Sequence, residues 1–437
     1  MTAAFRYRSA LLVPSLWSHT ADKAPARPRL GGDLNADVVI VGGGFTGLSA
    51  AHALAKRGAS AVVLEGRTVG WGASGRNGGV VSPKFRIAFQ DIAAAHGLDT
   101  AKRMHHIAHH AVDTVQELVS EHNLHSAHFE RTGFLRCAHN ERMMALMRTE
   151  VDWLHASLGD SSMNVLDRDQ LAHETGSRAF VGGVMTADAG TIHPLNYVRG
   201  LASALAAKQV PIYENSPVLR FKREANGVVV ETPEGRVRAR QLIIATNAYS
   251  DVSQATSCVK HTLIPFRSAI IATEPLPAEL DERLMVMRRS YGETRRMMRW
   301  FRKVDGRIIF GGRGAFGKED TPSAFAALQR AMIGLFPDLN GLSIDFKWSG
   351  HVAMTLNYLP HVGRLDDRTC FALGYNGTGV AMASLLGRYA AEFALGDSPD
   401  VALLDATRLK SVPLYPFREV GVRLAAGWYQ LLDAIGV

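Results

Sequence analysis

The stretch that decides the fold reads Val38-Val39-Ile40-Val41-Gly42-Gly43-Gly44-Phe45-Thr46-Gly47. Its apolar first half predicts a buried strand, and its glycines match the GxGxxG pattern that joins a strand to a helix in dinucleotide-binding folds. Gly42 permits the tight turn, Gly44 lets a pyrophosphate approach the backbone, and Gly47 lets the helix pack on the sheet. The N-terminus of that helix offers N–H groups and a partial positive charge to phosphates. The stretch therefore predicts a nucleotide-binding site.

The residues after this fingerprint complete a βαβ unit. We expect a helix over Leu48–Arg57 and a second strand over Ala61–Glu65, which ends in a carboxylate. An acidic side chain at the position of Glu65 accepts hydrogen bonds from ribose hydroxyls and disfavours a 2′-phosphate, so NADP is not expected. The unit predicts an α/β fold with a Rossmann-like domain but leaves FAD and NAD open.

The composition is that of a globular protein of about two domains, with 437 residues, 47% hydrophobic and 21% charged. The 49 Lys and Arg residues are interleaved with 41 Asp and Glu, so the net charge of +8 does not form a basic run. We therefore expect no nucleic-acid partner. The three cysteines form no CxxC pair, and no signal peptide or membrane-spanning helix is expected. These features indicate a cytoplasmic protein.

Beyond the βαβ unit, the pattern changes from helical to extended. Residues 1–35 are rich in proline and charge and predict an irregular arm, whereas 91–158 follow a helical pattern. From Val218 onward the pattern favours strands, with a last long helix over Val380–Ala394. Further expected elements are a helix over Pro194–Lys208, strands over Val237–Ala245, Ser268–Thr273, Arg307–Gly311 and Cys370–Leu373, and a helix over Ser323–Leu335.

Two further glycine-rich segments favour a flavin. Gly70–Gly79 reads GWGASGRNGG, and its small residues suit a backbone that lies against a flat ligand. Gly374–Gly379 reads GYNGTG and opens the last long helix, whose N-terminus would stabilise negative charge on a reduced flavin ring. Between them, the apolar strand Leu242–Tyr249 ends in small residues, as expected of a strand that returns to the nucleotide sheet.

At these motifs the sequence resembles the D-amino-acid-oxidase-like family of FAD-dependent oxidoreductases, and most of all its γ-glutamylputrescine oxidase branch. The resemblance implies a Rossmann-like FAD-binding domain of the GR2 type and an interleaved α+β substrate domain built on an antiparallel sheet. The expected division is an arm over 1–35, an FAD domain over 36–90, 180–260 and 345–410, a substrate domain over 91–179 and 261–344, and a C-terminal helix over 411–437.

The fingerprint, the glycine-rich segments and the resemblance together give a set of residues expected to bind FAD. Val218 is expected at the adenine, Thr246 near the phosphates, and Gly377–Val380 at the flavin ring. Relatives with covalent FAD carry a cysteine near the position of Gly350, so non-covalent FAD is expected here. The full set is Gly42, Gly44, Phe45, Thr46, Gly47, Glu65, Arg67, Gly72, Ala73, Ser74, Arg76, Asn77, Gly78, Val218, Thr246, Gly350, Gly377, Thr378, Gly379 and Val380.

Departures from the relatives bear on the chemistry. Sarcosine oxidases hold the substrate carboxylate with a lysine where this chain has Ala381, which favours an amine over an α-amino acid. They also place a lysine over the flavin where this chain offers Arg313. The sequence therefore does not decide whether dioxygen or another molecule is the electron acceptor. We expect hydride transfer from a small amine to FAD, giving an imine, by an oxidase rather than a dehydrogenase. Arg302 and His351 are the expected catalytic pocket groups, and Arg295, Arg299 and Arg302 follow helical spacing.

Several alternatives remain. The protein could be a D-amino-acid dehydrogenase or oxidase, coupled to a membrane, or a flavin-binding partner subunit without activity. No metal is expected, because the helical pairs among His105, His106, His109 and His110 carry no intervening glutamate and fit an exposed helix face. The C-terminal apolar stripe should dock on the protein body, with membrane-surface association as the alternative. It consists of Val420, Leu424, Trp428, Leu431, Leu432 and Ile435.

Overall fold

The fingerprint strand lies in the middle of an eight-stranded sheet in the computed structural model, which describes residues 12–315, 320–406 and 409–434. This strand, β1, runs parallel to β2 on one side and to β11 on the other, and β11 runs parallel to β18. The order is β17-β18-β11-β1-β2-β8, with β9 and β10 attached through β11. The strands span Gly32–Val41 (β1), Ala61–Leu64 (β2), Ile212–Tyr213 (β8), Arg220–Glu224 (β9), Gly227–Glu231 (β10), Gly235–Ile244 (β11), His361–Asp366 (β17) and Thr369–Leu373 (β18).

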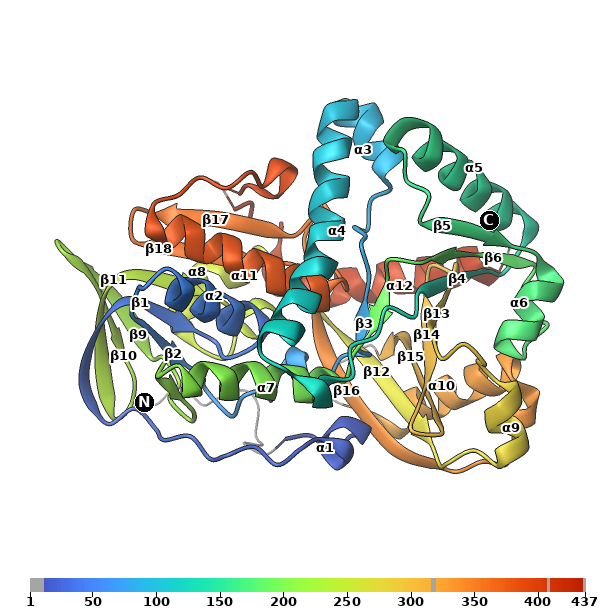
Figure 1. The fold of residues 1–437 in the computed structure, drawn as a ribbon, viewed down its shortest axis with the longest axis horizontal. Coiled ribbons are helices and arrows are strands. Elements are labelled where there is room, and N and C mark those ends of the chain that lie inside the picture. The colour runs from blue at the N-terminus through green and yellow to red at the C-terminus, as the bar shows by residue number, and fades with distance from the viewer. Residues whose placement is uncertain (1–11, 316–319, 407–408, 435–437) are drawn as a thin grey trace.

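Helices from distant parts of the chain pack on this first sheet and on one another (Figure 1). Helix α11 is apolar nearly all round and contacts both α2 and α4, so it forms the centre of the main hydrophobic core. Gly387 of α11 allows the close approach to α2, since a Cβ there would collide with the Thr46 carbonyl oxygen. The helices span Phe45–Lys56 (α2), Phe89–His96 (α3), Leu98–Glu121 (α4), Pro194–Ala207 (α7), Ser257–Lys260 (α8) and Gly379–Leu395 (α11).

The second large sheet is mostly antiparallel and lies beside the first, in the order β16-β12-β15-β14-β13-β4-β6-β5 (Figure 1). A separate core, stacked around Phe301 and Phe310, packs it against α10. Its strands span Phe134–Ala138 (β4), Met163–Leu166 (β5), Gly182–Thr186 (β6), Ile264–Thr273 (β12), Ser290–Glu293 (β13), Arg299–Val304 (β14), Arg307–Ala315 (β15) and Ile344–Met354 (β16). Its helices are α5 (Glu141–Leu158), α6 (Arg168–Thr175), α9 (Ala278–Arg283) and α10 (Pro322–Leu335), and a small ladder joins β3 (Val80–Val81) to β7 (Gly190–Thr191).

These two sheets agree with the predicted Rossmann-like domain and its interleaved partner, but several predicted boundaries move. The predicted helical stretch over 91–158 is interrupted by strand β4, in which buried apolar residues lie on both sides of the half-buried Arg136. Strands β6 and β16 pair within the second sheet, so 182–186 and 344–354 lie with the substrate domain. Helix α4 packs on α11 and therefore lies with the nucleotide sheet. The boundaries between the domains, redrawn in this way, are our proposal.

The predicted N-terminal arm also contains regular structure. Helix α1 (Leu16–Thr20) has a capping box at Ser15, and Leu16 and Trp17 are fully buried in the main core. The Trp17 indole donates to the carbonyl oxygen of Asn77 at 2.8 Å, which ties the arm to the glycine-rich loop. Strand β1 begins at Gly32, within the residues predicted as arm. Burial of Trp17 thus orders part of the segment over 1–35, whose prolines and charges predicted an irregular arm.

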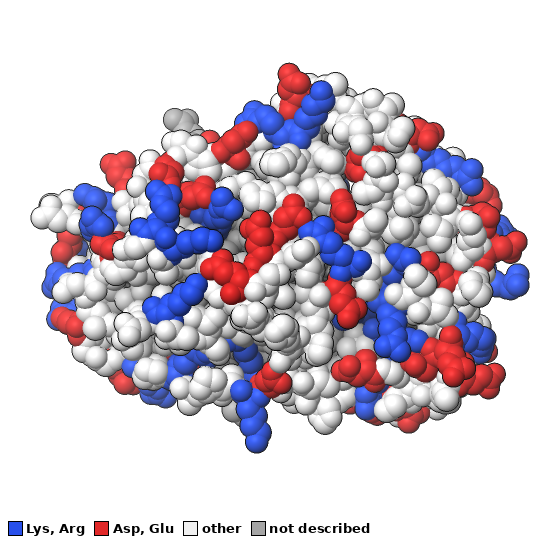
Figure 2. Space-filling model, viewed as in Figure 1, with Lys and Arg blue, Asp and Glu red and all other residues white. Residues whose placement is uncertain are grey.

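The predicted C-terminal helix is present as α12 (Arg418–Ala434), and of its predicted apolar stripe Leu432 is partly buried. Val420, Leu424 and Trp428 are all exposed, so the expected packing on the protein body is wrong for these residues. Ile435 lies outside the described residues, and so does the side chain of Leu431. Among the helices of the described chain, none combines the length and apolar character that crossing a bilayer requires. Figure 2 shows basic and acidic side chains intermixed over the face in view.

Candidate functional site

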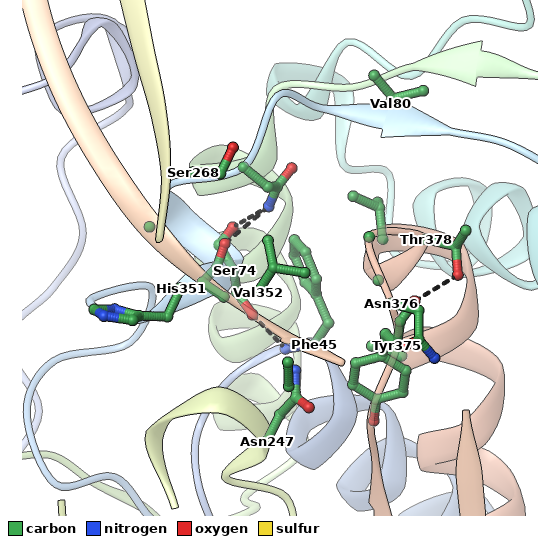
Figure 3. Close-up of a pocket in the computed structure, with 18 of the residues that line it drawn as sticks. Phe45, Ser74, Val80, Asn247, Ser268, His351, Val352, Tyr375, Asn376 and Thr378 are labelled. Atoms are coloured by element: carbon green, nitrogen blue, oxygen red, sulfur yellow. Dashed lines mark hydrogen bonds between the residues drawn. The ribbon is translucent and has the colours of Figure 1, made fainter. Parts of the chain in front are cut away.

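A cavity of about 670 Å³ extends from the fingerprint loop of the first sheet to the face of the second sheet. Figure 3 shows the residues that surround it, with Tyr375, Asn376 and Thr378 on one side and Ser268 and Val352 on the other. All the residues predicted to bind FAD line this cavity except Gly47. The cavity therefore brings together the motifs that are far apart in the sequence.

The fingerprint glycines have the backbone roles that the motif predicts. Gly42 has a φ of +111°, and a Cβ there would lie 2.8 Å from the carbonyl oxygen of Ala245. A Cβ on Gly47 would collide with the Gly42 carbonyl oxygen, so this glycine serves the turn rather than the cavity lining. A Cβ on Gly44 would lie 2.8 Å from the Ser74 hydroxyl oxygen and would narrow the cavity. The N-terminus of α2 therefore borders the cavity through bare backbone.

Glu65 lies at the end of β2, under the fingerprint loop. Its carboxylate accepts hydrogen bonds from the backbone N–H groups of Gly43 and Arg67, each at 2.8 Å, one on each oxygen. Burial raises the pKa of the Glu65 carboxyl, although these two N–H groups oppose the shift. Because each carboxylate oxygen has two lone pairs, both can still accept a hydrogen bond from a ribose hydroxyl.

The glycine-rich loop over 70–79 is held firmly in place. Arg76 donates from Nε to the Trp71 carbonyl oxygen at 2.7 Å, and its guanidinium lies 4.8 Å from the centre of the Trp71 ring. The Asn77 side chain donates to the carbonyl oxygen of Ala73 at 3.0 Å and accepts from the N–H of Gly79 at 2.8 Å. A Cβ on Gly78 would collide with the ring of Trp300, so the loop is in contact with β14 of the second sheet.

The opposite side of the cavity is formed where β18 leads into α11. The backbone turns at Asn376, whose φ is +53°, and Thr378 donates from its hydroxyl to the Tyr375 carbonyl oxygen at 2.8 Å. The Tyr375 hydroxyl lies 2.6 Å from the hydroxyl of Thr46, which joins the start of α11 to the start of α2. Two helix N-termini thus border the same cavity, and both favour negative charge.

The second sheet covers the cavity with one face of β12 and β16. Ser268 pairs with Gly350 and Phe266 pairs with Val352, so these four residues share the face that lines the cavity. His351 also lines the cavity, although it pairs with Arg267 and strand alternation directs these two side chains toward the other face of the sheet. In Figure 3 the His351 ring points away from Tyr375 and Thr378. Its ring packs edge-on at 5.5 Å against Tyr249, and burial lowers its pKa.

Arg302 also differs from its predicted role. It lies on strand β14, which corrects the helical spacing expected for Arg295, Arg299 and Arg302, and its side chain does not line the cavity. The guanidinium donates to the carbonyl oxygens of Gly79 at 2.9 Å, Ile192 at 3.3 Å and Gly78 at 3.4 Å. Burial lowers its pKa to about 10. Arg302 thus braces the glycine-rich loop from behind, and we do not propose it as a catalytic group.

Sequence reasoning missed the charged end of the cavity, which is formed by Lys84, Arg136 and Glu150. Arg136 donates to Glu150 at 2.9 Å, and the Lys84 ammonium lies 4.0 Å from the centre of the Phe134 ring. These residues lie in a connecting segment, a strand and a helix that are far apart in sequence, so no local spacing marks them. The side chain of Arg313, considered for the electron acceptor, lies outside the described residues.

Of the histidines in the predicted run, His105 and His109 lie close to Asp160. His105 contacts its carboxylate at 2.9 Å, and His109 lies 3.1 Å from Asp188. Ser162 donates its backbone N–H to Asp160 at 2.8 Å. These contacts satisfy Asp160 without an ion, and the cluster lies outside the cavity lining.

Comparison with known proteins places this cavity in context. The family pattern described as "DAO: FAD dependent oxidoreductase" matches residues 37–393. The chain is 33% identical over 405 residues to the probable oxidoreductase OrdL of Haemophilus influenzae, covering 91% of this chain and 92% of that protein. It is 30% identical over 431 residues to gamma-glutamylputrescine oxidoreductase of Escherichia coli, covering 97% and 99%. The structure of glycine oxidase from Geobacillus kaustophilus matches with a TM-score of 0.73 at 18% identity, covering 86% and 99%.

Proposed function

Because the chain belongs to the DAO family of FAD-dependent oxidoreductases, we propose that it oxidises a C–N bond of a small amine. Bound FAD would accept a hydride from the carbon that bears the nitrogen, and water would hydrolyse the resulting imine. The nitrogen supplies the electron pair of the new C=N bond and loses its proton. An amine that binds in its neutral form needs no protein base for this step.

FAD is the cofactor of this family, and the residues present fit it. The ADP half would lie on the fingerprint loop, where a Cβ on Gly44 would fill the cradle, with its ribose at Glu65. The flavin half would lie between the glycine-rich loop and the N-terminus of α11. There the helix dipole would stabilise negative charge, and Phe266 and Trp300 would exclude water from the reacting carbon.

The observation that favours an amine is the environment of Ala381. This residue is buried, 1% exposed, and does not line the cavity, whereas relatives with a lysine there bind a substrate carboxylate next to the flavin. Among the described side chains, the apolar wall formed by Phe266, Ile270 and Trp300 offers no cation in its place. A carboxylate packed against this wall would lose its hydration without gaining a partner from it.

The test compares butylamine with each enantiomer of norvaline, which is butylamine with an α-carboxylate and has no second amine. The rate of anaerobic flavin reduction at sub-saturating substrate is measured from the loss of visible absorbance. Butylamine should reduce the flavin about 10-fold or more faster, since a charge-assisted bond contributes about 1.5–3 kcal/mol. Faster reduction by norvaline would reject the amine assignment in favour of an amino acid. No bleaching by any amine, with FAD bound, would support a partner subunit without activity.

One observation favours a second candidate, an amino-acid dehydrogenase that passes electrons to an acceptor in a membrane. Val420, Leu424 and Trp428 form an exposed stripe on α12, as in helices that lie on a membrane surface. Oxygen consumption with peroxide release during turnover would reject this candidate. Slow oxidation by dioxygen, with cosedimentation on vesicles that is lost in Trp428→Ser, would support it.

A further inference from the structure

Two histidines one turn apart on α4 face a buried aspartate from another element. His105 and His109 are four residues apart, so their rings lie on one face of the helix, with ring centres 4.3 Å apart. The Nε2 atoms of both rings face Oδ2 of Asp160, at 2.9 Å for His105 and 3.8 Å for His109. The side chain of Asp160 is 4% exposed. The helical spacing alone predicts no metal, but the fold adds a carboxylate to the pair.

Backbone contacts fix the position of this carboxylate. Helix α5 ends at Gly159, whose φ of +66° turns the chain, and Asp160 follows directly. The backbone N–H of Ser162 donates to Oδ1 of Asp160 at 2.8 Å, which leaves Oδ2 toward α4. The same loop is joined to the turn after β6, because the N–H of Ala187 donates to the Ser162 carbonyl oxygen at 2.9 Å. The carboxylate is therefore held in place before any ion arrives.

Asp188, in the turn after β6, lies at the other nitrogen of the His109 ring. Its carboxylate is 3.1 Å from Nδ1 of His109. A neutral imidazole carries one proton, and a carboxylate at Nδ1 holds it there. The Nε2 lone pair of His109 then faces Oδ2 of Asp160, which is also an acceptor and lies beyond hydrogen-bond distance. A carboxylate behind a histidine, with a lone pair in front, is the usual arrangement around a metal-bound histidine.

The distances fit an ion between the three side chains. Zn²⁺ with tetrahedral ligands at about 2.0–2.1 Å places neighbouring ligand atoms about 3.3 Å apart. The two N–O distances, 2.9 and 3.8 Å, lie on either side of this value, and all three ligand atoms lie within 4.8 Å of one another. An ion would replace the hydrogen bond between His105 and Asp160. The carboxylates of Asp160 and Asp188 would balance its charge.

The described chain holds one further group of such ligands, formed by His52, Glu121 and His122. Its carboxylate already pairs with two ammonium groups, Lys56 at 3.2 Å and Lys208 at 3.3 Å. These two cations oppose the entry of a metal ion. Nε2 of His122 also lies within hydrogen-bond distance of His52 Nδ1, at 3.0 Å. The second group is therefore the weaker candidate and supplies a matched control.

We propose that His105, His109 and Asp160 bind a divalent transition-metal ion such as Zn²⁺. Asp188 acts as a positioning residue that orients His109, and water completes the coordination. Since α4 packs on α11 of the first sheet and α5 packs on β6 of the second, the ion joins elements of both sheets. The His105 ring also packs edge-on at 5.1 Å against Phe89, which lines the cavity. The ion thus stabilises the cavity wall from outside and takes no part in the oxidation.

The experiment uses the tag-free, FAD-loaded protein after dialysis against EDTA and then against metal-free buffer. Calorimetric titration with Zn²⁺ gives the stoichiometry and dissociation constant, and Mg²⁺ is the comparison because it prefers oxygen ligands. The site variants are His109→Ala and Asp188→Asn. The controls are His122→Ala, in the second group, and His106→Ala, in the other helical pair of α4, with His110. Flavin content and melting temperature without metal show that each variant is folded.

The wild type and both controls should bind one Zn²⁺ per chain, and at least about 10-fold more tightly than Mg²⁺. Asp188→Asn should weaken Zn²⁺ binding about 10- to 100-fold, and His109→Ala by more. Saturating Zn²⁺ should raise the melting temperature of the wild type by about 2–5 °C, but not that of His109→Ala. No Zn²⁺ binding by the wild type, an unchanged affinity in His109→Ala, or equal affinity for Mg²⁺ overturns the proposal. Loss of binding in His122→Ala instead also overturns it, because the ion would then lie in the second group.

Discussion

Replacing Arg302 by methionine tests whether this residue supports the glycine-rich loop or takes part in catalysis. The guanidinium is 7% exposed and makes one good hydrogen bond, to Gly79 at 2.9 Å, and two long ones. A charge-assisted bond contributes about 1.5–3 kcal/mol, and each long bond contributes less. Removing the charge also removes the free-energy cost of desolvating it, which offsets part of this loss. The net loss of stability should therefore be roughly 2–3 kcal/mol, since methionine fills most of the same volume.

The assay has two readouts. The melting temperature should fall by roughly 2–6 °C, and FAD should dissociate more readily because the loop over 78–79 loses its support. In protein saturated with FAD, the limiting rate of anaerobic flavin reduction should stay within about threefold of the wild type. Arg330→Met, at an exposed position on α10, serves as the control and should change neither readout.

The result that refutes this reasoning is equally specific. A fall in the limiting reduction rate of 100-fold or more, with stability and FAD affinity unchanged, would mean that Arg302 acts on the reacting groups. In that case the guanidinium would have to leave the carbonyl oxygens of Gly79 and Ile192 when substrate binds.

Further predictions concern the cofactor. Acid precipitation should release all the flavin as free FAD, since no cysteine lines the cavity in the described chain; flavin left on the pellet would contradict this. Gly44→Val should abolish FAD binding, because even a Cβ would lie 2.8 Å from Ser74 Oγ. A full flavin complement in this variant would contradict the placement of the FAD pyrophosphate at Gly44. Glu65→Ala should weaken FAD binding, measured by titration of the apoprotein, by about 1–3 kcal/mol.

The cofactor half of the cavity could be predicted because backbone atoms form it. Where a ligand approaches the main chain closely, only glycine or another small residue fits, and this requirement leaves a motif in one continuous stretch. Gly42 and Gly44 were therefore recognisable without a structure, and so was the loop that contains Gly78. The same sequence signals gave a correct α/β fold, because β1, α2 and β2 each follow from local patterns.

The catalytic roles predicted for Arg302 and His351 depend on a feature that the sequence does not show. Arg302 and His351 are polar residues next to recognisable segments, but the side of a strand on which each lies depends on register. His351 shares its face with Arg267 and not with Ser268, a fact that only the pairing of β12 with β16 reveals. A shift of one residue in that register would turn the imidazole to the face that Ser268 and Gly350 share.

The charged end of the cavity was beyond prediction because side chains from separate elements form it. No local sequence pattern marks Lys84, Arg136 or Glu150 as a cavity residue. The same residue types on the protein surface would have similar sequence surroundings. Their chemistry arises only when β4, α5 and the segment after β3 meet. A shared fold therefore carries the flavin site from protein to protein, while the residues that choose the substrate can differ without changing any motif.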